Sequence, residues 1–167
     1  PSAELKENCT WALKGLIQLS TVQFPKGTRG VQLDGFARLA LWKEGKDYNH
    51  GTGHGVGSFM NVHEGPQNIR KDMNAQELIP GMVLSNEPGF YYENHYGIRH
   101  ENLIAVQEKE TTDFGTFYEF ETLTICPFDK NVVALELLTE PEKAWMNNYH
   151  EWCKEKLEPS LEGEVKD

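Results

Sequence analysis

The chain contains 167 residues, enough for one domain with a sizeable core and too few to expect two. Its 38% hydrophobic and 11% aromatic residues are typical of a folded globular protein rather than a disordered one. Lys and Arg number 16 against 26 Asp and Glu, and the net charge of −10 disfavours nucleic acid and anionic membranes as partners. No apolar run approaches the ~20 residues of a membrane span and no charged-then-apolar leader opens the chain, so we expect a soluble, unsecreted protein.

Three widely spaced cysteines form no CxxC pair, which argues against a disulfide framework or a structural zinc site. We expect Cys9, Cys126 and Cys153 to be partly buried free thiols of a reducing compartment, and therefore a cytoplasmic location. The first residue is proline rather than methionine, which hints at a processed or truncated chain.

The N-terminal half of the chain predicts two helices. The first is expected over residues 2–24, with Ser2 as N-cap and Pro25 just past the end. Its helical period is carried by Leu5, Cys9, Leu13, Leu16 and Ile17. The second is expected over residues 31–44, ended by Gly45. One side of it, the expected packing side, carries Phe36, Leu39, Ala40 and Trp42.

Residues 50–128 predict a sheet region, because short β-rich runs such as MVLSNE, GIRHENLIAV and ETLTICPF alternate with Gly, Pro and Asn. Helix returns at about 139–157, where Thr139 and Glu142 have capping-box spacing. Trp145, Tyr149 and Trp152 share one face of this helix and are interpreted as packing residues. We expect one domain over residues 1–158 and a polar, frayed tail over residues 159–167.

The stretch HGTGHGVG, residues 50–57, has glycine at every second position. Glycine loses more backbone entropy on ordering than any other residue, so four glycines in eight positions need a reason. In an extended chain His50, Thr52 and His54 share one face, and the opposite bare face lets another backbone or a substrate come close. The competing interpretation is a flexible, turn-rich loop with incidental histidines.

Common nucleotide and hydrolase motifs do not fit these histidines. Val56 breaks the dinucleotide fingerprint, no GxxxxGK[ST] or GxSxG occurs, and His63-Glu64 lacks the second histidine of HExxH. The sequence therefore excludes the usual nucleotide-binding, serine-hydrolase and zincin functions.

Two glutamates stand at strand-like positions, Glu87 in SNEPGFYY and Glu101 in GIRHEN. If GIRHENLIAV is one strand, Arg99 and Glu101 share a face, and an inward carboxylate needs a cation that Arg99 or a metal could supply. The turn signal Pro88-Gly89 would let the two glutamates stand on neighbouring antiparallel strands with converging carboxylates. Surface glutamates beside a structural histidine are the alternative that the residues alone leave open.

The blocks HGTGHGVGSFMNVHEGP, SNEPGFYY and YGIRHEN, in this order, resemble those of the aminopeptidase P group of pita-bread metallopeptidases. The resemblance covers essentially the whole chain. Prolidases and methionine aminopeptidases have the same histidine and glutamates, but the residues that flank them differ. It implies an α+β fold, the C-terminal part of a pita-bread domain with helices packed on a curved, mainly antiparallel sheet. It also implies release of the N-terminal residue from peptides with proline second, using two divalent metals, typically manganese.

By this resemblance His54, Glu87 and Glu101 are metal ligands. This donor set suits manganese, and cobalt or zinc is compatible with it. Two metals bridged by Glu101 would lower the pKa of a shared water and provide a hydroxide nucleophile near neutral pH. Glu87 would also act as general base, passing the proton to the leaving proline nitrogen.

The resemblance implies three supporting roles in addition. His63 would stabilise the tetrahedral intermediate by facing the developing oxyanion. His50 would contact the substrate near its proline, and Arg99 would brace the ligands from behind. The expected partners are thus peptides that begin Xaa-Pro.

Two aspartate ligands of the family pattern, which lie upstream of the first helix, have no counterpart. Asp34 falls in a predicted helix and Asp47 in a turn, so neither matches them. We therefore expect the chain to be the C-terminal portion of a longer enzyme and to be inactive or a poor catalyst alone, because three side chains cannot saturate two metals. The missing half would leave apolar surface exposed, so we expect this chain to self-associate, whereas the parent enzyme is compatible with a homodimer.

Other functions stay open at this point. A prolidase would hydrolyse dipeptides only, and a non-catalytic pita-bread module would bind peptides or histones without chemistry. The three ligand positions argue for an enzyme parent, since such modules normally lose them. A purely structural α+β domain is the remaining alternative for the fragment.

Overall fold

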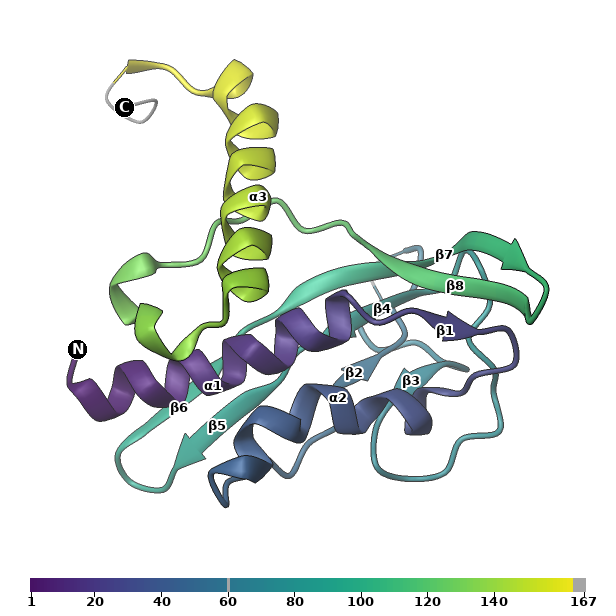
Figure 1. The fold of residues 1–167 in the computed structure, drawn as a ribbon, viewed down its shortest axis with the longest axis horizontal. Coiled ribbons are helices and arrows are strands. Elements are labelled where there is room, and N and C mark those ends of the chain that lie inside the picture. The colour runs from purple at the N-terminus through teal and green to yellow at the C-terminus, as the bar shows by residue number, and fades with distance from the viewer. Residues whose placement is uncertain (60, 164–167) are drawn as a thin grey trace.

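The computed structural model describes residues 1–59 and 61–163. Its centre is a four-stranded antiparallel sheet in the order β1-β8-β7-β4, with two helices lying along it (Figure 1). The strands are β1 (Phe24–Pro25), β4 (Val83–Asn86), β7 (Asn102–Thr112) and β8 (Gly115–Thr122). Two further antiparallel pairs join β2 (Gly53–His54) with β3 (Asn68–Ile69), and β5 (Gly89–Tyr92) with β6 (Tyr96–Arg99). The α+β prediction is confirmed.

Helix α1 (Ala3–Ser20) is shorter than the expected 2–24. Ser2 caps its start as predicted, accepting a hydrogen bond from the Leu5 amide. The chain leaves the helix at Thr21 because Phe24 pairs with Tyr118 of β8 and is only 2% exposed in the core. Of the predicted apolar positions, Leu5 is half-buried and the other four, Cys9, Leu13, Leu16 and Ile17, are buried.

Helix α2 (Gly30–Lys43) confirms the second predicted helix, but of the four residues predicted to line its apolar side only Ala40 is buried. Phe36, Leu39 and Trp42 are 43%, 41% and 47% exposed. The two helices approach so closely that a Cβ added to Gly15 of α1 would lie 2.0 Å from the Ala37 carbonyl oxygen. Such an approach selects small residues at the contact, and Phe36, Leu39 and Trp42 lie outside it. The buried residues of α2 are Gly30, Leu33, Asp34, Ala37, Arg38, Ala40 and Leu41.

The predicted strand GIRHENLIAV is two strands, since β6 ends at Arg99 and β7 begins at Asn102. The His100 amide donates to the Pro88 carbonyl between them, so the chain changes its partner there. Arg99 and Glu101 therefore do not share a face of one strand. The run ETLTICPF is likewise strand only as far as Thr122.

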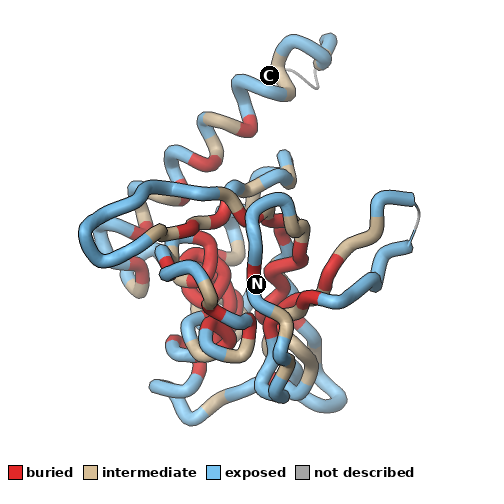
Figure 2. Tube along the Cα trace, turned by 90° about the vertical axis from the view of Figure 1, so that its right-hand side faces the viewer, coloured by how far each residue is buried: buried red, intermediate tan, exposed pale blue. Residues whose placement is uncertain are grey.

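Helix α3 (Glu140–Leu157) stands away from the sheet, and buried positions recur along it (Figures 1 and 2). The predicted capping box of Thr139 and Glu142 is present. Lys14 of α1 binds both the Glu142 carboxylate and, at 2.9 Å, the Leu137 carbonyl, which fixes α3 to α1. Tyr149 is buried and its ring stacks on that of Trp145, with centroids 5.2 Å apart, in agreement with a packing role.

The remaining expectations concern the cysteines, the tail and membranes. Cys9 and Cys153 are buried free thiols and Cys126 is an exposed one. A short 3-10 turn over Glu158–Ser160 continues past the expected boundary at 158, and residues 164–167 of the predicted tail lie outside the described residues. No helix among the described residues has the length and apolarity needed to cross a bilayer.

Candidate metal centre

A cavity of about 400 Å³ opens beside the glycine-rich segment. Five of the six residues predicted for the site line it: His50, His54, His63, Glu87 and Arg99. The sixth, Glu101, borders this group: its carboxylate lies near the ligand atoms offered by His54 and Glu87. The structure thus brings together side chains that are up to 51 positions apart in the sequence.

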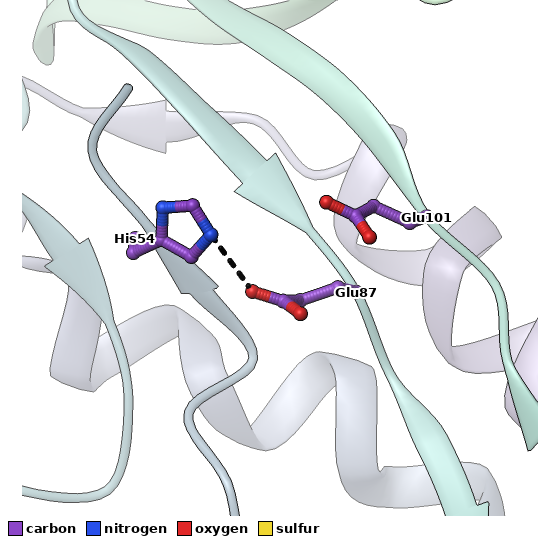
Figure 3. A group of neighbouring side chains, drawn as sticks. All are labelled: His54, Glu87 and Glu101. Atoms are coloured by element: carbon purple, nitrogen blue, oxygen red, sulfur yellow. Dashed lines mark ion pairs between the residues drawn. The ribbon is translucent and has the colours of Figure 1, made fainter. Parts of the chain in front are cut away.

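His54, Glu87 and Glu101 are neighbouring side chains (Figure 3), and each offers one ligand atom that lies within 4.8 Å of the other two. His54 ends β2, Glu87 follows β4 and Glu101 precedes β7. Asn86 and Asn102 are register partners in the antiparallel β4–β7 pair, so the residues just beyond them emerge at the same end. The prediction of converging carboxylates is confirmed.

The His54 ring is oriented for a cation. Its Nδ1 lies 2.9 Å from the Gly55 carbonyl oxygen, which can only accept, so Nδ1 carries a proton. Nε2 then offers a lone pair and lies 3.2 Å from Oε1 of Glu87, another acceptor. Two acceptors facing each other need a cation or a shared proton between them. One imidazole and two carboxylates are also the donors that first-row divalent metals accept, so the residues fit a metal ion.

Glu87 is the buried carboxylate of the group, at 7% exposure, and Glu101 is exposed. Ser85 donates its hydroxyl proton to Oε1 of Glu87, and Arg99 lies 3.1 Å from Oε2. The inward carboxylate beside a guanidinium is therefore Glu87, which corrects the expectation for Glu101. A hydrogen bond to Tyr91 and the nearby carboxylates raise the pKa of Arg99 above its ordinary value, so it is a fixed positive charge.

Tyr91 of β5 links His50 to Arg99, and the sequence analysis missed it. Its hydroxyl lies 2.8 Å from Nε2 of His50 and accepts the Nε–H of Arg99 at 2.8 Å. Tyr91 faces Gly97 across the β5–β6 pair, and only two positions separate Gly97 from Arg99. The signal was present in SNEPGFYY, where an aromatic pair follows the predicted ligand Glu87 in an exposed hairpin.

His63 lies in the exposed turn region after the glycine-rich segment, with its ring centroid 4.2 Å from that of His54. The two rings are tilted by 45°, so His63 covers one side of the His54 ring. It is thus near the predicted metal ligands, as expected, and it is an exposed residue that lines the cavity.

The glycines of the segment permit close approach of other backbone. A Cβ on Gly53 would lie 2.0 Å from the Ser85 carbonyl oxygen, and one on Gly55 would lie 1.9 Å from that of Glu64. The expectation of close backbone packing is confirmed. The single face shared by His50, Thr52 and His54 is not, because only Gly53–His54 is strand and Thr52 is fully buried, hydrogen-bonded to Asp34.

Comparison with known sequences agrees with this site. Residues 1–108 match the profile of metallopeptidase family M24, and residues 116–167 match the C-terminal region of peptidase M24. Aminopeptidase P2 of Arabidopsis thaliana is 50% identical over 167 residues, covering 98% of this chain and 24% of that protein. A probable Xaa-Pro aminopeptidase P of Laccaria bicolor is 46% identical over 171 residues, covering 99% of this chain and 27% of that protein. The chain spans about a quarter of the length of these relatives.

Solved structures give the same fold. The X-prolyl aminopeptidase of Caenorhabditis elegans, described as a cytosolic enzyme with a di-nuclear active site, superposes with a TM-score of 0.89 at 40% identity. The match covers 99% of this chain and 27% of that one. An Xaa-Pro dipeptidase of Bacillus anthracis reaches a TM-score of 0.61 at 28% identity, over 77% of this chain and 33% of that one. The predicted pita-bread fold is confirmed.

Proposed function

The chain belongs to metallopeptidase family M24, and from this premise we propose that it is part of the catalytic domain of an aminopeptidase that removes the first residue from Xaa-Pro peptides. The observation that carries the proposal is the convergence of His54, Glu87 and Glu101, whose ligand atoms lie within 4.8 Å of one another. Relatives over 98% or more of the chain bear the names aminopeptidase P2 and probable Xaa-Pro aminopeptidase P. The name of the Caenorhabditis enzyme also supports a cytosolic location for the whole protein.

His54, Glu87 and Glu101 are the proposed ligands of two divalent ions, with manganese as the first candidate because oxygen donors predominate. When bound, such a pair supplies a water that is nucleophilic at neutral pH and a Lewis acid for the scissile carbonyl. Three side chains leave coordination positions open on two ions, so further ligands from outside this chain belong to the proposal. The chain alone is then inactive, and residues 1–158 are a partial catalytic domain followed by a tail over residues 159–167.

The other cavity residues take roles that follow from their contacts. Glu87 accepts the proton of the attacking water and returns it to the proline nitrogen, since its Oε1 faces the proposed metal position. His63 offers an N–H to the developing oxyanion from beside His54. His50 borders the cavity where the substrate's proline would lie. Arg99 and Tyr91 hold Glu87 and His50 in place through the hydrogen bonds described above.

A chimera tests this proposal directly. Residues 1–167 would replace the matching region of the Arabidopsis relative, whose upstream segment would supply the remaining ligands. We expect manganese-stimulated release of the first residue from a tripeptide with proline second. A His54→Ala chimera is the control that assigns the activity to this chain. Equal rates on a tripeptide with alanine second, or activity on Xaa-Pro dipeptides alone, would refute the proposed specificity.

A further inference from the structure

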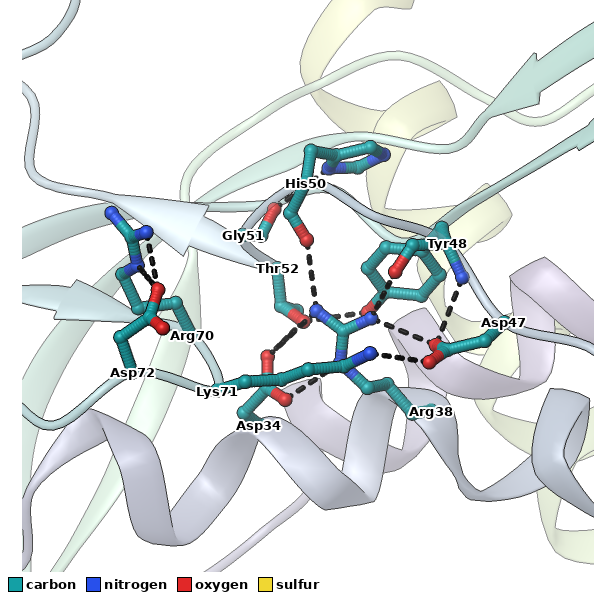
Figure 4. Close-up of polar contacts among 10 residues, drawn as sticks. All are labelled: Asp34, Arg38, Asp47, Tyr48, His50, Gly51, Thr52, Arg70, Lys71 and Asp72. Carbon is teal, nitrogen blue, oxygen red and sulfur yellow. Dashed lines mark hydrogen bonds and ion pairs between the residues drawn. The ribbon is translucent and has the colours of Figure 1, made fainter.

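A second polar cluster, formed around Arg38 of α2, lies behind the glycine-rich segment (Figure 4). Arg38 is 1% exposed, and each of its five N–H groups has an acceptor. Two of these bonds form a fork with Asp34, one turn earlier on the helix, at 2.6 and 3.2 Å. An arginine saturated in this way has a fixed orientation, because the guanidinium is planar and its donors are rigid.

Two acceptors of Arg38 are backbone carbonyls of the segment that leads into the cavity. The Tyr48 carbonyl accepts at 2.6 Å and the His50 carbonyl at 2.8 Å. Residues 44–52 contain no helix or strand, so ladder hydrogen bonds do not fix this backbone. Arg38 instead provides hydrogen bonds that hold the backbone carbonyls of this segment in place.

Side chains of the same segment complete the cluster. Thr52 donates to Asp34 at 2.7 Å and lies 2.6 Å from the Tyr48 hydroxyl. The Tyr48 ring lies between the Arg38 guanidinium, 3.8 Å from its centroid, and the His50 ring, at 4.8 Å and 33°. His50 is therefore contacted at its carbonyl by Arg38 and at its ring by Tyr48 as well as by Tyr91.

The cluster also reaches the other wall of the cavity. Asp47 accepts from Nη1 of Arg38 at 2.9 Å and forms an ion pair with Lys71, next to the cavity residue Arg70. Partial burial pushes the pKa of Asp47 upward, but the hydrogen bonds from Lys71 and Arg38 outweigh it and lower that pKa to about 2. Asp47 is thus a permanent anion that ties residues 70–72 to α2.

We propose that Arg38 and Asp34 are positioning residues: they set the backbone of residues 48–52 and thereby aim His50 and His54 into the cavity. The inference rests on the proposed function for the role of that cavity, and on contacts alone for the positioning. A buried ion pair is weak evidence for added stability, because apolar side chains of similar volume often stabilise as well. Two bonds to backbone carbonyls of an irregular segment indicate instead that geometry is what the pair provides.

Two variants of this chain test the proposal, with one control. Arg38→Lys keeps the charge but has three donors in place of five and no planar fork. Thr52→Val keeps the shape and removes the bonds to Asp34 and Tyr48, and it decides the question if Arg38→Lys fails to fold. The control is Lys14→Met, which breaks the buried pair of Lys14 and Glu142, neither of which lines the cavity.

The readouts are the imidazole NMR signals of His50 and the Mn²⁺ affinity measured by titration. We expect both cluster variants to shift the His50 signals, and to weaken Mn²⁺ binding by about 10-fold to 100-fold, as for groups that orient metal ligands. Lys14→Met should lower the melting temperature without either effect. Folded cluster variants with unchanged His50 signals would overturn the positioning role. If the unmodified chain bound no Mn²⁺, the proposed function would be in doubt, while the His50 signals would still decide this inference.

Discussion

The Nε2 atom of His54 lies 3.2 Å from Oε1 of Glu87, while Nδ1 of the same ring faces the Gly55 carbonyl. This opposition of two acceptors predicts that Mn²⁺ binds between them. We expect weak binding by the chain alone, weaker than micromolar, because three side chains leave open positions on the ion. His54→Ala should abolish this binding and His63→Ala should keep it.

His95 offers a matched control for that titration. It is an exposed histidine beside the β5–β6 turn, stacked on Tyr92 at 4.3 Å, away from the ligand group. His95→Ala should leave the Mn²⁺ isotherm unchanged. Loss of binding in His63→Ala would mean that His63 is a ligand, and a tight two-ion isotherm for the unmodified chain would show that its site is more complete than proposed.

A second prediction concerns the rate in the chimera with the Arabidopsis relative. His63→Ala should retain the metals and lose turnover on the order of 10²–10³-fold, since a single oxyanion donor has about that effect. Metal analysis of the purified protein and steady-state rates on an Xaa-Pro tripeptide check it. A loss below threefold would remove His63 from the catalytic group.

A third prediction is that Gly53→Ala lowers the stability of the fold, because other backbone lies close to Gly53. Gly53→Ala would place a Cβ 2.0 Å from the Ser85 carbonyl, so β2 and β4 must separate, at a cost of about 1–3 kcal/mol or more. Gly35→Ala is the matched control, because a Cβ there meets only the Trp42 ring at 3.8 Å. Within α2 that change should stabilise by about 0.5–1 kcal/mol. Urea unfolding of both variants measures the two opposite effects.

The Lys14–Glu142 pair predicts a pH dependence of stability. Burial raises the pKa of Glu142, but hydrogen bonds from Lys14 and Thr139 outweigh it, so that pKa lies below its ordinary value. The pair therefore stabilises fully above about pH 4.3, the ordinary glutamate pKa, and loses its effect as the pH falls through the lower folded value.

Glu142→Gln tests this dependence. At pH 7 it should destabilise by about 3–5 kcal/mol, because Lys14 is left buried without its partner. The difference from the unmodified chain should shrink as the pH falls from 5 toward 3. Glu140→Gln, at an exposed pair with Lys143, should change little at either pH. A difference that is constant with pH would contradict the assignment.

Local rules predicted much of this structure. The capping box of Thr139 and Glu142 marked the start of α3, and antiparallel pairing after a turn signal predicted that Glu87 and Glu101 converge. Each rests on interactions within a few residues or on one strand pair. The resemblance to a family then selected His54 as the proposed ligand among the candidate histidines.

Tertiary packing decided what sequence patterns could not. Of the residues predicted to line the apolar side of α2, Phe36 and Trp42 are exposed, whereas Ala37 lies at the close contact with Gly15. Asp34 and Arg38 have the spacing of an ordinary surface ion pair on a helix, so nothing local marked them as buried. Their importance depends on backbone carbonyls 10 and 12 positions downstream, which only the folded chain brings near.

The outward strip of Phe36, Leu39 and Trp42 on α2 carries the last prediction, that the chain associates with a second copy. These side chains are 41–47% exposed on one helix, and the relatives are about four times as long as this chain. Apolar strips of this kind favour contact with another surface, and in the isolated chain a second copy is the surface available.

Leu39→Glu should shift sedimentation toward monomer by placing a charge in the middle of the strip, where its burial would be costly. Phe114→Glu is the control, since Phe114 is 93% exposed in the turn between β7 and β8 and does not belong to the α2 strip. If the unmodified chain sediments as a monomer at high concentration, the strip does not drive association. If Phe114→Glu dissociates the dimer as well as Leu39→Glu does, net charge rather than the α2 strip controls it, because both changes add one negative charge to a chain that already carries −10.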